Sequence, residues 1–114
     1  MEKQVFNFED ALERADGDLE FLEQLLEVLE SSSATYIEQI ETAINNNNLT
    51  EAYRSAHSLK GALLNLGAEK AGELAKQTEI KLKSGNRDVN LEEVCQSIQE
   101  FIETARATIR EKKA

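Results

Sequence analysis

The sequence predicts an all-α protein, an antiparallel four-helix bundle with a short extra helix at its N-terminus. Its 114 residues are 40% hydrophobic and include no proline, no tryptophan and only five glycines. That composition favours a compact helical chain over a sheet or a disordered tail. Apolar residues recur at helical spacing in four segments, and short clusters of turn-forming residues separate them. We expect one domain over residues 1–114, because this length supports a single core.

The first half of the chain is predicted to form a short helix and then a long one. A short amphipathic segment at about 8–14 precedes a turn in which Asp18 is placed to cap the next helix. From Leu19 to Ile44, apolar residues mostly keep helical spacing, which predicts one long helix. Three serines at 31–33 are poor helix formers, so a bend or two shorter helices is the alternative.

The third predicted helix carries the only histidine of the chain. Asn48 with Glu51 forms a capping-box-like start for a helix over about 49–66. Gly67 follows directly, where a glycine suits a left-handed C-cap. The sequence therefore predicts both the start and the end of this helix.

Two further helices complete the predicted bundle. A helix over about 68–83 is ended by the Ser-Gly-Asn turn at 84–86. Asn90 with Glu93 then repeats the capping pattern, and the last helix carries apolar positions as far as Ile109. Short turns between these helices favour antiparallel neighbours.

Charge and composition exclude several classes of function. The net charge is −9, and no basic stripe is present for phosphate contacts, so we expect no nucleic-acid partner. No signal peptide is visible, and no segment approaches the roughly 20 apolar residues of a membrane span, so we expect a cytoplasmic protein without membrane insertion. Charge on most helix faces favours a monomer. Cys95, the only cysteine, lies at an apolar position, and we expect it in the core.

His57 is predicted to point into solvent. At about 100° per residue, one narrow arc of the histidine helix forms the core stripe, and His57 lies roughly 140° from its centre. The members of this stripe are Ala52, Ala56, Leu59, Leu63 and Leu66. The outer face around His57 collects Tyr53, Arg54, Lys60, Gly61 and Leu64.

The surroundings of His57 indicate a docking surface, whereas an ordinary exposed histidine is the alternative. A glycine inside a helix costs roughly 0.5–1 kcal/mol relative to alanine, so Gly61 indicates that a partner approaches closely there. Leu64 adds an exposed apolar contact. Residues 53–87 hold seven basic side chains against three glutamates. We therefore expect a partner with an acidic pocket or a phosphoryl group.

The segment Ala56-His57-Ser58-Leu59-Lys60-Gly61, followed by Asn65-Leu66-Gly67, resembles the signature of histidine-containing phosphotransfer (HPt) domains, which are the carriers of two-component phosphorelays. The resemblance covers most of the chain. It implies that His57 is the phosphoacceptor, which attacks an aspartyl phosphate on a receiver domain and later returns the phosphoryl group to another receiver. It further implies that Lys60 pairs with phosphoryl oxygens and that Gly61 lets the receiver approach.

The same resemblance implies which groups of the active site each partner supplies. Magnesium and the rest of the active site would come from the receiver domain. The sequence contains no Gly-rich phosphate loop, metal-ligand constellation or ATP site, so we expect a phosphocarrier rather than an enzyme, with no cofactor of its own. The expected partners are receiver domains of response regulators or a hybrid sensor histidine kinase. They would contact Tyr53, Arg54, Gly61 and Leu64.

Three positions depart from the family pattern. Leu63 and Leu64 stand where small residues are usual, so Leu64 narrows the approach to His57. Thr78 replaces a core-facing leucine and is expected to loosen the packing. Two other functions stay open: a scaffold that docks receivers with an idle histidine, and an inhibitor that occupies a kinase surface. A ferritin-like metal enzyme is excluded, because Arg54 stands where a Glu-x-x-His motif needs glutamate.

Overall fold

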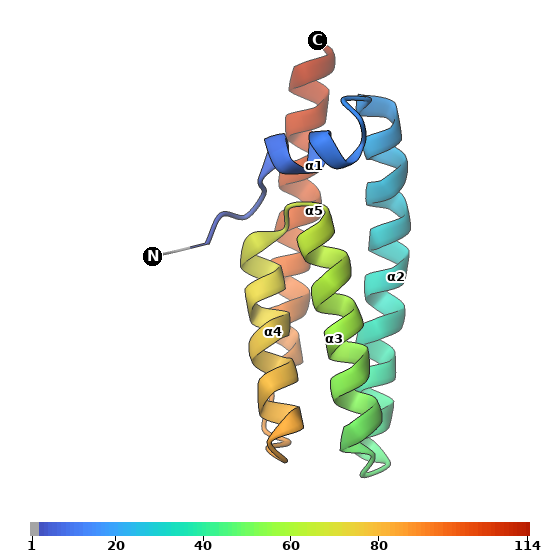
Figure 1. Ribbon diagram of the computed structural model, residues 1–114, viewed down its shortest axis with the longest axis vertical. Helices are drawn as coiled ribbons and strands as arrows, with labels where there is room; N and C mark the ends of the chain where they lie inside the picture. Colours follow the sequence, from blue (N-terminus) through green and yellow to red (C-terminus); the bar gives the residue numbers. More distant parts are fainter. Residues whose placement is uncertain (1–2) are drawn as a thin grey trace.

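The computed structural model describes residues 3–114, and five α-helices account for most of them. The helices are α1 (Phe8–Arg14), α2 (Leu19–Asn45), α3 (Leu49–Asn65), α4 (Glu69–Lys83) and α5 (Leu91–Lys113). Helices α2 to α5 run alternately up and down side by side, and α1 lies across one end (Figure 1). The described part of the chain has no strand. The predicted all-α bundle with a short N-terminal helix is confirmed.

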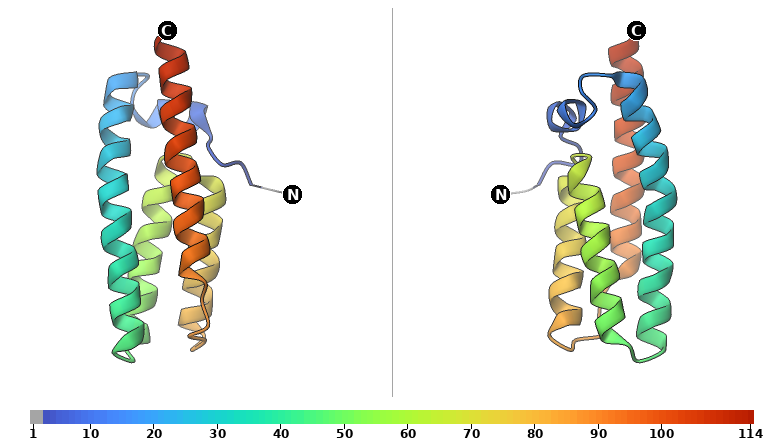
Figure 2. Two further views of the ribbon diagram at one scale, coloured as in Figure 1. Left: turned by 180° about the vertical axis from the view of Figure 1, so that it is seen from behind. Right: turned by 45° about the vertical axis from the view of Figure 1, so that its right-hand side comes forward.

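The four long helices differ in length, and this difference makes room for α1. Helices α2 and α5 have 27 and 23 residues, whereas α3 and α4 have 17 and 15. The longer pair therefore extends past the α3–α4 turn, and α1 lies beside this extension (Figure 2). In residues 3–114, no helix is both long enough and apolar enough to cross a membrane.

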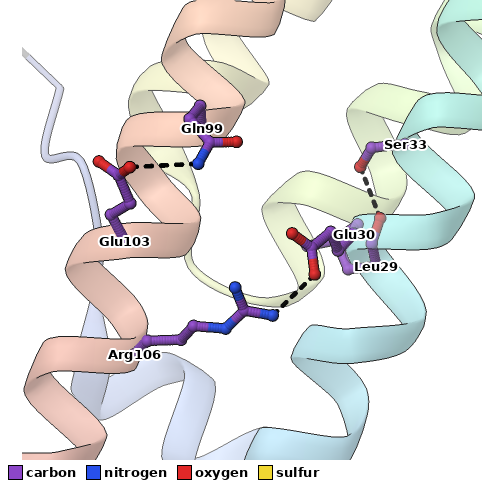
Figure 3. A network of polar contacts seen from close by, with 6 residues as sticks. All are labelled: Leu29, Glu30, Ser33, Gln99, Glu103 and Arg106. Atoms are coloured by element: carbon purple, nitrogen blue, oxygen red, sulfur yellow. Dashed lines mark hydrogen bonds and ion pairs between the residues drawn. The ribbon is translucent and has the colours of Figure 1, made fainter.

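Helix α2 is continuous through its three serines. The hydroxyls of Ser32 and Ser33 donate to the carbonyls of Val28 and Leu29, one turn earlier, at 2.8 and 2.7 Å. These bonds satisfy the serine side chains without interrupting the backbone ladder, and Ser33 is buried. Figure 3 shows the bond from Ser33 to Leu29 beside an ion pair that joins α2 to α5, between Glu30 and Arg106 at 2.7 Å. The predicted single long helix is confirmed, and the alternative of two shorter helices is wrong.

Side-chain caps begin α2, α3 and α5 as predicted. A side-chain oxygen of Asp18, Asn48 or Asn90 accepts hydrogen bonds from backbone N–H groups two or three residues later, at 3.0–3.2 Å. The predicted bounds of α3 and α4 shift inward by one residue, because Leu66 and Ala68 are caps. Helix α5 extends past Ile109 to a last turn of basic side chains that suits the helix dipole.

The core follows the inner faces of the four long helices. All five members of the stripe predicted on α3 are at most 7% exposed. Thr78 is also buried, and its hydroxyl donates to the carbonyl of Leu74 at 2.9 Å. A buried hydroxyl with a partner costs little, so the structure accommodates this threonine. The largest buried side chains are Phe101, Leu22, Ile40, Leu59, Leu63, Leu82, Ile102 and Ile109.

The prediction that Cys95 belongs to the core is wrong. Its neighbour Val94 is buried, but Cys95 is exposed, because one residue rotates the side chain by about 100° around the helix. Partial desolvation, with the carboxylates of Glu41 and Glu92 nearby, raises the pKa of the Cys95 thiol. This thiol is therefore a poor nucleophile at neutral pH.

An extended segment before α1 fixes the turn between α3 and α4. The backbone N–H of Asn7 donates to the carbonyl of Gly67 at 2.8 Å, and its side-chain amide donates to Glu69 at 2.9 Å. Gly67 has a φ of 74°, which confirms the predicted left-handed cap. A Cβ at this position would lie 2.5 Å from the carbonyl oxygen of Asn7. The turn therefore requires glycine both for its φ and for this close contact.

We expect Gly67→Ala to lower the free energy of unfolding by about 3 kcal/mol, because it combines left-handed strain with a backbone clash. Gly85→Ala is the matched control. Gly85 has a φ of 90°, but a Cβ there would meet nothing within 4 Å, so only about 1 kcal/mol should be lost. Urea unfolding followed by circular dichroism measures both. Equal losses in the two variants would contradict the role assigned to the Asn7 contact.

Candidate functional site

The structure places His57 on the exposed side of α3, near the middle of the helix. Its side chain is 64% exposed, as the helical register predicts. Arg54 and Gly61 are exposed, whereas Tyr53 is half-buried. Leu64 is 41% exposed. The residues that the sequence singled out therefore share one face of α3, with Tyr53, Lys60 and Leu64 turned towards α4.

A carboxylate from α4 joins His57 and Lys60. One side-chain oxygen of Glu79, Oε2, lies 2.9 Å from Nδ1 of His57, and the other, Oε1, lies 3.0 Å from Nζ of Lys60. The side chains of Glu79 and Lys60 are only 16% and 23% exposed. Both are therefore shielded from bulk water much more than the side chain of His57 is. Reasoning from the sequence missed Glu79, since it belongs to no motif and lies 22 residues after His57.

Glu79 is ionised at neutral pH. Partial burial by itself would raise the pKa of its carboxyl group, but hydrogen bonds and charge from Lys60 and His57 outweigh this effect. Together these causes hold the pKa of Glu79 below its ordinary value. The site therefore presents a negative charge to Nδ1 of the imidazole.

The contact with Glu79 assigns the roles of the two imidazole nitrogens. An ionised carboxylate can only accept hydrogen bonds, so Nδ1 of His57 carries the proton in the neutral ring. Nε2 then holds the free lone pair. This arrangement leaves Nε2 as the nucleophilic atom, on a side chain whose orientation is fixed from a second helix.

Gly61 leaves open space one turn after His57. A Cβ placed there would meet no atom within 4 Å, so packing inside the molecule does not require glycine. A tight contact inside the molecule therefore does not explain why this helix contains a destabilising glycine. The absence of a side chain widens access to the helix backbone beside His57.

Leu64 has an internal role that the sequence did not predict. A Cβ at Gly72 on α4 would lie 2.5 Å from Cδ2 of Leu64, so the leucine side chain packs directly over this glycine. Part of Leu64 remains exposed beside the histidine face. The residue therefore joins α3 to α4 and also contributes apolar surface.

Helix α4 contributes a cation to this face. Nζ of Lys83 lies 5.8 Å from the centre of the Tyr53 ring, a cation–π contact that turns Tyr53 towards α4. Ile80, next to Glu79 in the chain, is 57% exposed. Within residues 3–114, no group of three or more His, Cys, Asp or Glu side chains is arranged to hold a metal ion.

Comparison with protein families agrees with this geometry. A family model for the Hpt domain matches residues 24–108, which include most of α2 and α5 and all of α3 and α4. The N-terminal segment and α1 precede the matched region. Neither the curated proteins nor the solved structures gave a match. Since the matched region covers well over half of the chain, this protein belongs to the Hpt domain family, the phosphocarrier modules of two-component systems.

Proposed function

We propose that this protein carries phosphoryl groups on Nε2 of His57, between receiver domains of a phosphorelay. The observation that supports this most is the exposed imidazole whose Nδ1 is bound by Glu79, 2.9 Å away, so that Nε2 is free to attack. Transfer to the protein forms a bond between Nε2 and phosphorus. The bond between phosphorus and the receiver aspartate breaks, and its electron pair returns to the aspartate carboxylate.

Lys60 is proposed to stabilise the phosphoryl oxygens during transfer. Phosphoryl transfer depends mainly on in-line positioning and charge neutralisation, so one nucleophile and one cation are sufficient on this side. Lys60 stands one helical turn after His57, and its ammonium group is held near the ring by Glu79. Magnesium and the remaining groups of the active site would be supplied by the receiver.

The receiver is proposed to dock on the face of α3 and α4 around His57. Gly61 lets its backbone approach, Leu64 supplies an apolar contact, and Tyr53 and Arg54 lie one turn before the histidine. Ile80, which follows Glu79 on α4, is exposed, and we propose that it adds apolar surface to this face. Basic side chains nearby suit the acidic pocket that surrounds a receiver aspartate.

The proposal also covers the oligomeric state, the location and the partners of the protein. The protein would act as a monomeric domain over residues 1–114, in the cytoplasm, with a hybrid sensor kinase or response regulators as its partners. It would bind no ATP and would not phosphorylate itself. A receiver-docking scaffold with an idle histidine is the competing function, and transfer assays distinguish the two.

We expect His57→Gln to abolish phosphate uptake and to leave the fold intact, because the side chain is exposed. The measurement is transfer of label from a radiolabelled receiver, with magnesium present, to the wild-type protein and to the variant. Label on the wild type should be labile in acid and stable in base. Circular dichroism checks that the variant is folded. Label retained by the variant would place the acceptor elsewhere, and no label on either protein would favour the scaffold.

Lys60→Ala should slow transfer by about tenfold or more, because an ammonium that neutralises phosphoryl charge is lost. Binding of the receiver should persist, since the docking face is otherwise unchanged. Rapid-quench measurement of labelling, combined with titration calorimetry, separates the two effects. A rate equal to that of the wild type would show that the ammonium group is not near the transferred phosphoryl group.

Leu64→Ala should weaken receiver binding by about 1–2 kcal/mol, because it removes the apolar contact proposed for docking. Phe21→Ala is the matched control, because Phe21 is also 41% exposed but lies in the first turn of α2. Titration calorimetry with the receiver measures both affinities. Stability is measured alongside, since Leu64 also packs on Gly72. Equal affinities of the two variants for the receiver would show that Leu64 is not part of the interface.

A further inference from the structure

We propose that Glu79 keeps Nδ1 of phosphorylated His57 protonated, and that this proton speeds the transfer of the phosphoryl group to a receiver. The inference rests on the proposed function, in which Nε2 of His57 carries the phosphoryl group. It concerns the second half of the cycle, the return of that group to a receiver. Glu79 acts here as a positioning residue, because it touches the imidazole and not the transferred group.

The position of the carboxylate supports this role. Oε2 of Glu79 lies 2.9 Å from Nδ1 of His57, and Lys60 holds Oε1 at 3.0 Å. Glu79 lies between Thr78 and Leu82, which are buried in the core, so α4 keeps the carboxylate in place. The carboxylate therefore needs no rearrangement between the free and the phosphorylated states of the ring.

The proton balance of the cycle shows why retention matters. The neutral ring enters with a proton on Nδ1, and its Nε2 lone pair forms the bond to phosphorus. The phosphorylated ring then carries a proton on Nδ1, the phosphoryl group on Nε2 and a positive charge. On donation, a carboxylate oxygen of the receiver aspartate forms a bond to phosphorus and the nitrogen–phosphorus bond breaks. The electron pair of the broken bond returns to Nε2, which leaves neutral imidazole. If Nδ1 had lost its proton, the leaving group would be an imidazolide anion, which is far poorer.

The charges around His57 make Glu79 the group that stabilises this cationic ring. Ser55 contacts Gln39 of α2, and His57 is separated from Ser55 by about 160° around the axis of α3, so the ring points away from α2. By helical register, Arg54 and Lys60 share the side of α3 that carries His57, and Lys76 and Lys83 share the side of α4 that carries Glu79. These four residues are cations, which disfavour a positive ring. Glu79 is an anion, and it is in direct contact with the ring.

The test compares wild-type protein with Glu79→Gln, which preserves a hydrogen-bond acceptor but removes the charge. Both are phosphorylated chemically with phosphoramidate, and the ring of phosphorylated His57 is titrated by phosphorus NMR. The midpoint should fall by roughly half to one pH unit in the variant. At a pH well above the wild-type midpoint, donation from the variant to a receiver should be about 3- to 10-fold slower, in proportion to the protonated fraction.

Two further variants make the result specific. Glu73→Gln is the matched control, because Glu73 is on α4 but lines the groove against α5, and its midpoint should equal that of the wild type. Glu79→Asp keeps the charge and should recover part of the shift. Equal midpoints for wild type and Glu79→Gln would overturn the inference, and so would a lower midpoint with unchanged donation. If chemical labelling of His57 succeeds but no receiver takes the label, the proposed function fails, and the titration still decides the role of Glu79.

Discussion

The close packing of α3 against α4 is the constraint on which the rest of the site depends. Leu64 packs over Gly72 so tightly that a Cβ on the glycine would lie 2.5 Å from the leucine side chain. This approach sets the two helices at a distance where a glutamate on one reaches a histidine and a lysine on the other. A looser contact would leave Glu79 in solvent, where such pairs contribute little.

The site combines an exposed reactive atom with a fixed ring. His57 must be exposed to meet a receiver, yet an exposed side chain is normally free to rotate. Glu79 restricts that freedom at Nδ1 without covering Nε2. The scaffold around it is rigid for separate reasons: the N-terminal segment fixes the α3–α4 turn through Asn7 and Gly67, and helix caps fix the starts of α2, α3 and α5. Rigidity is useful here because phosphoryl transfer depends on positioning.

The differences between sequence and structure have distinct physical causes. Cys95 was misplaced because an apolar pattern does not resolve neighbouring positions on a helix, where one residue means about 100° of rotation. Thr78 keeps a polar atom in the core, because its hydroxyl bonds to the carbonyl of Leu74 within the same helix. Glu79 was missed because antiparallel pairing of two helices, and not their local sequence, decides which residues face each other.

Local chemistry let the sequence alone determine the helices, their caps, the core stripe of α3 and the outward direction of His57. These features depend on helical periodicity and on residues a few positions apart, so they can be read along one segment. Only the tertiary structure decided that Glu79 bridges His57 and Lys60, that Leu64 packs on Gly72, and that Asn7 closes the turn at Gly67. Each of these contacts joins different segments of the chain, and it exists only once packing has set their distance and register.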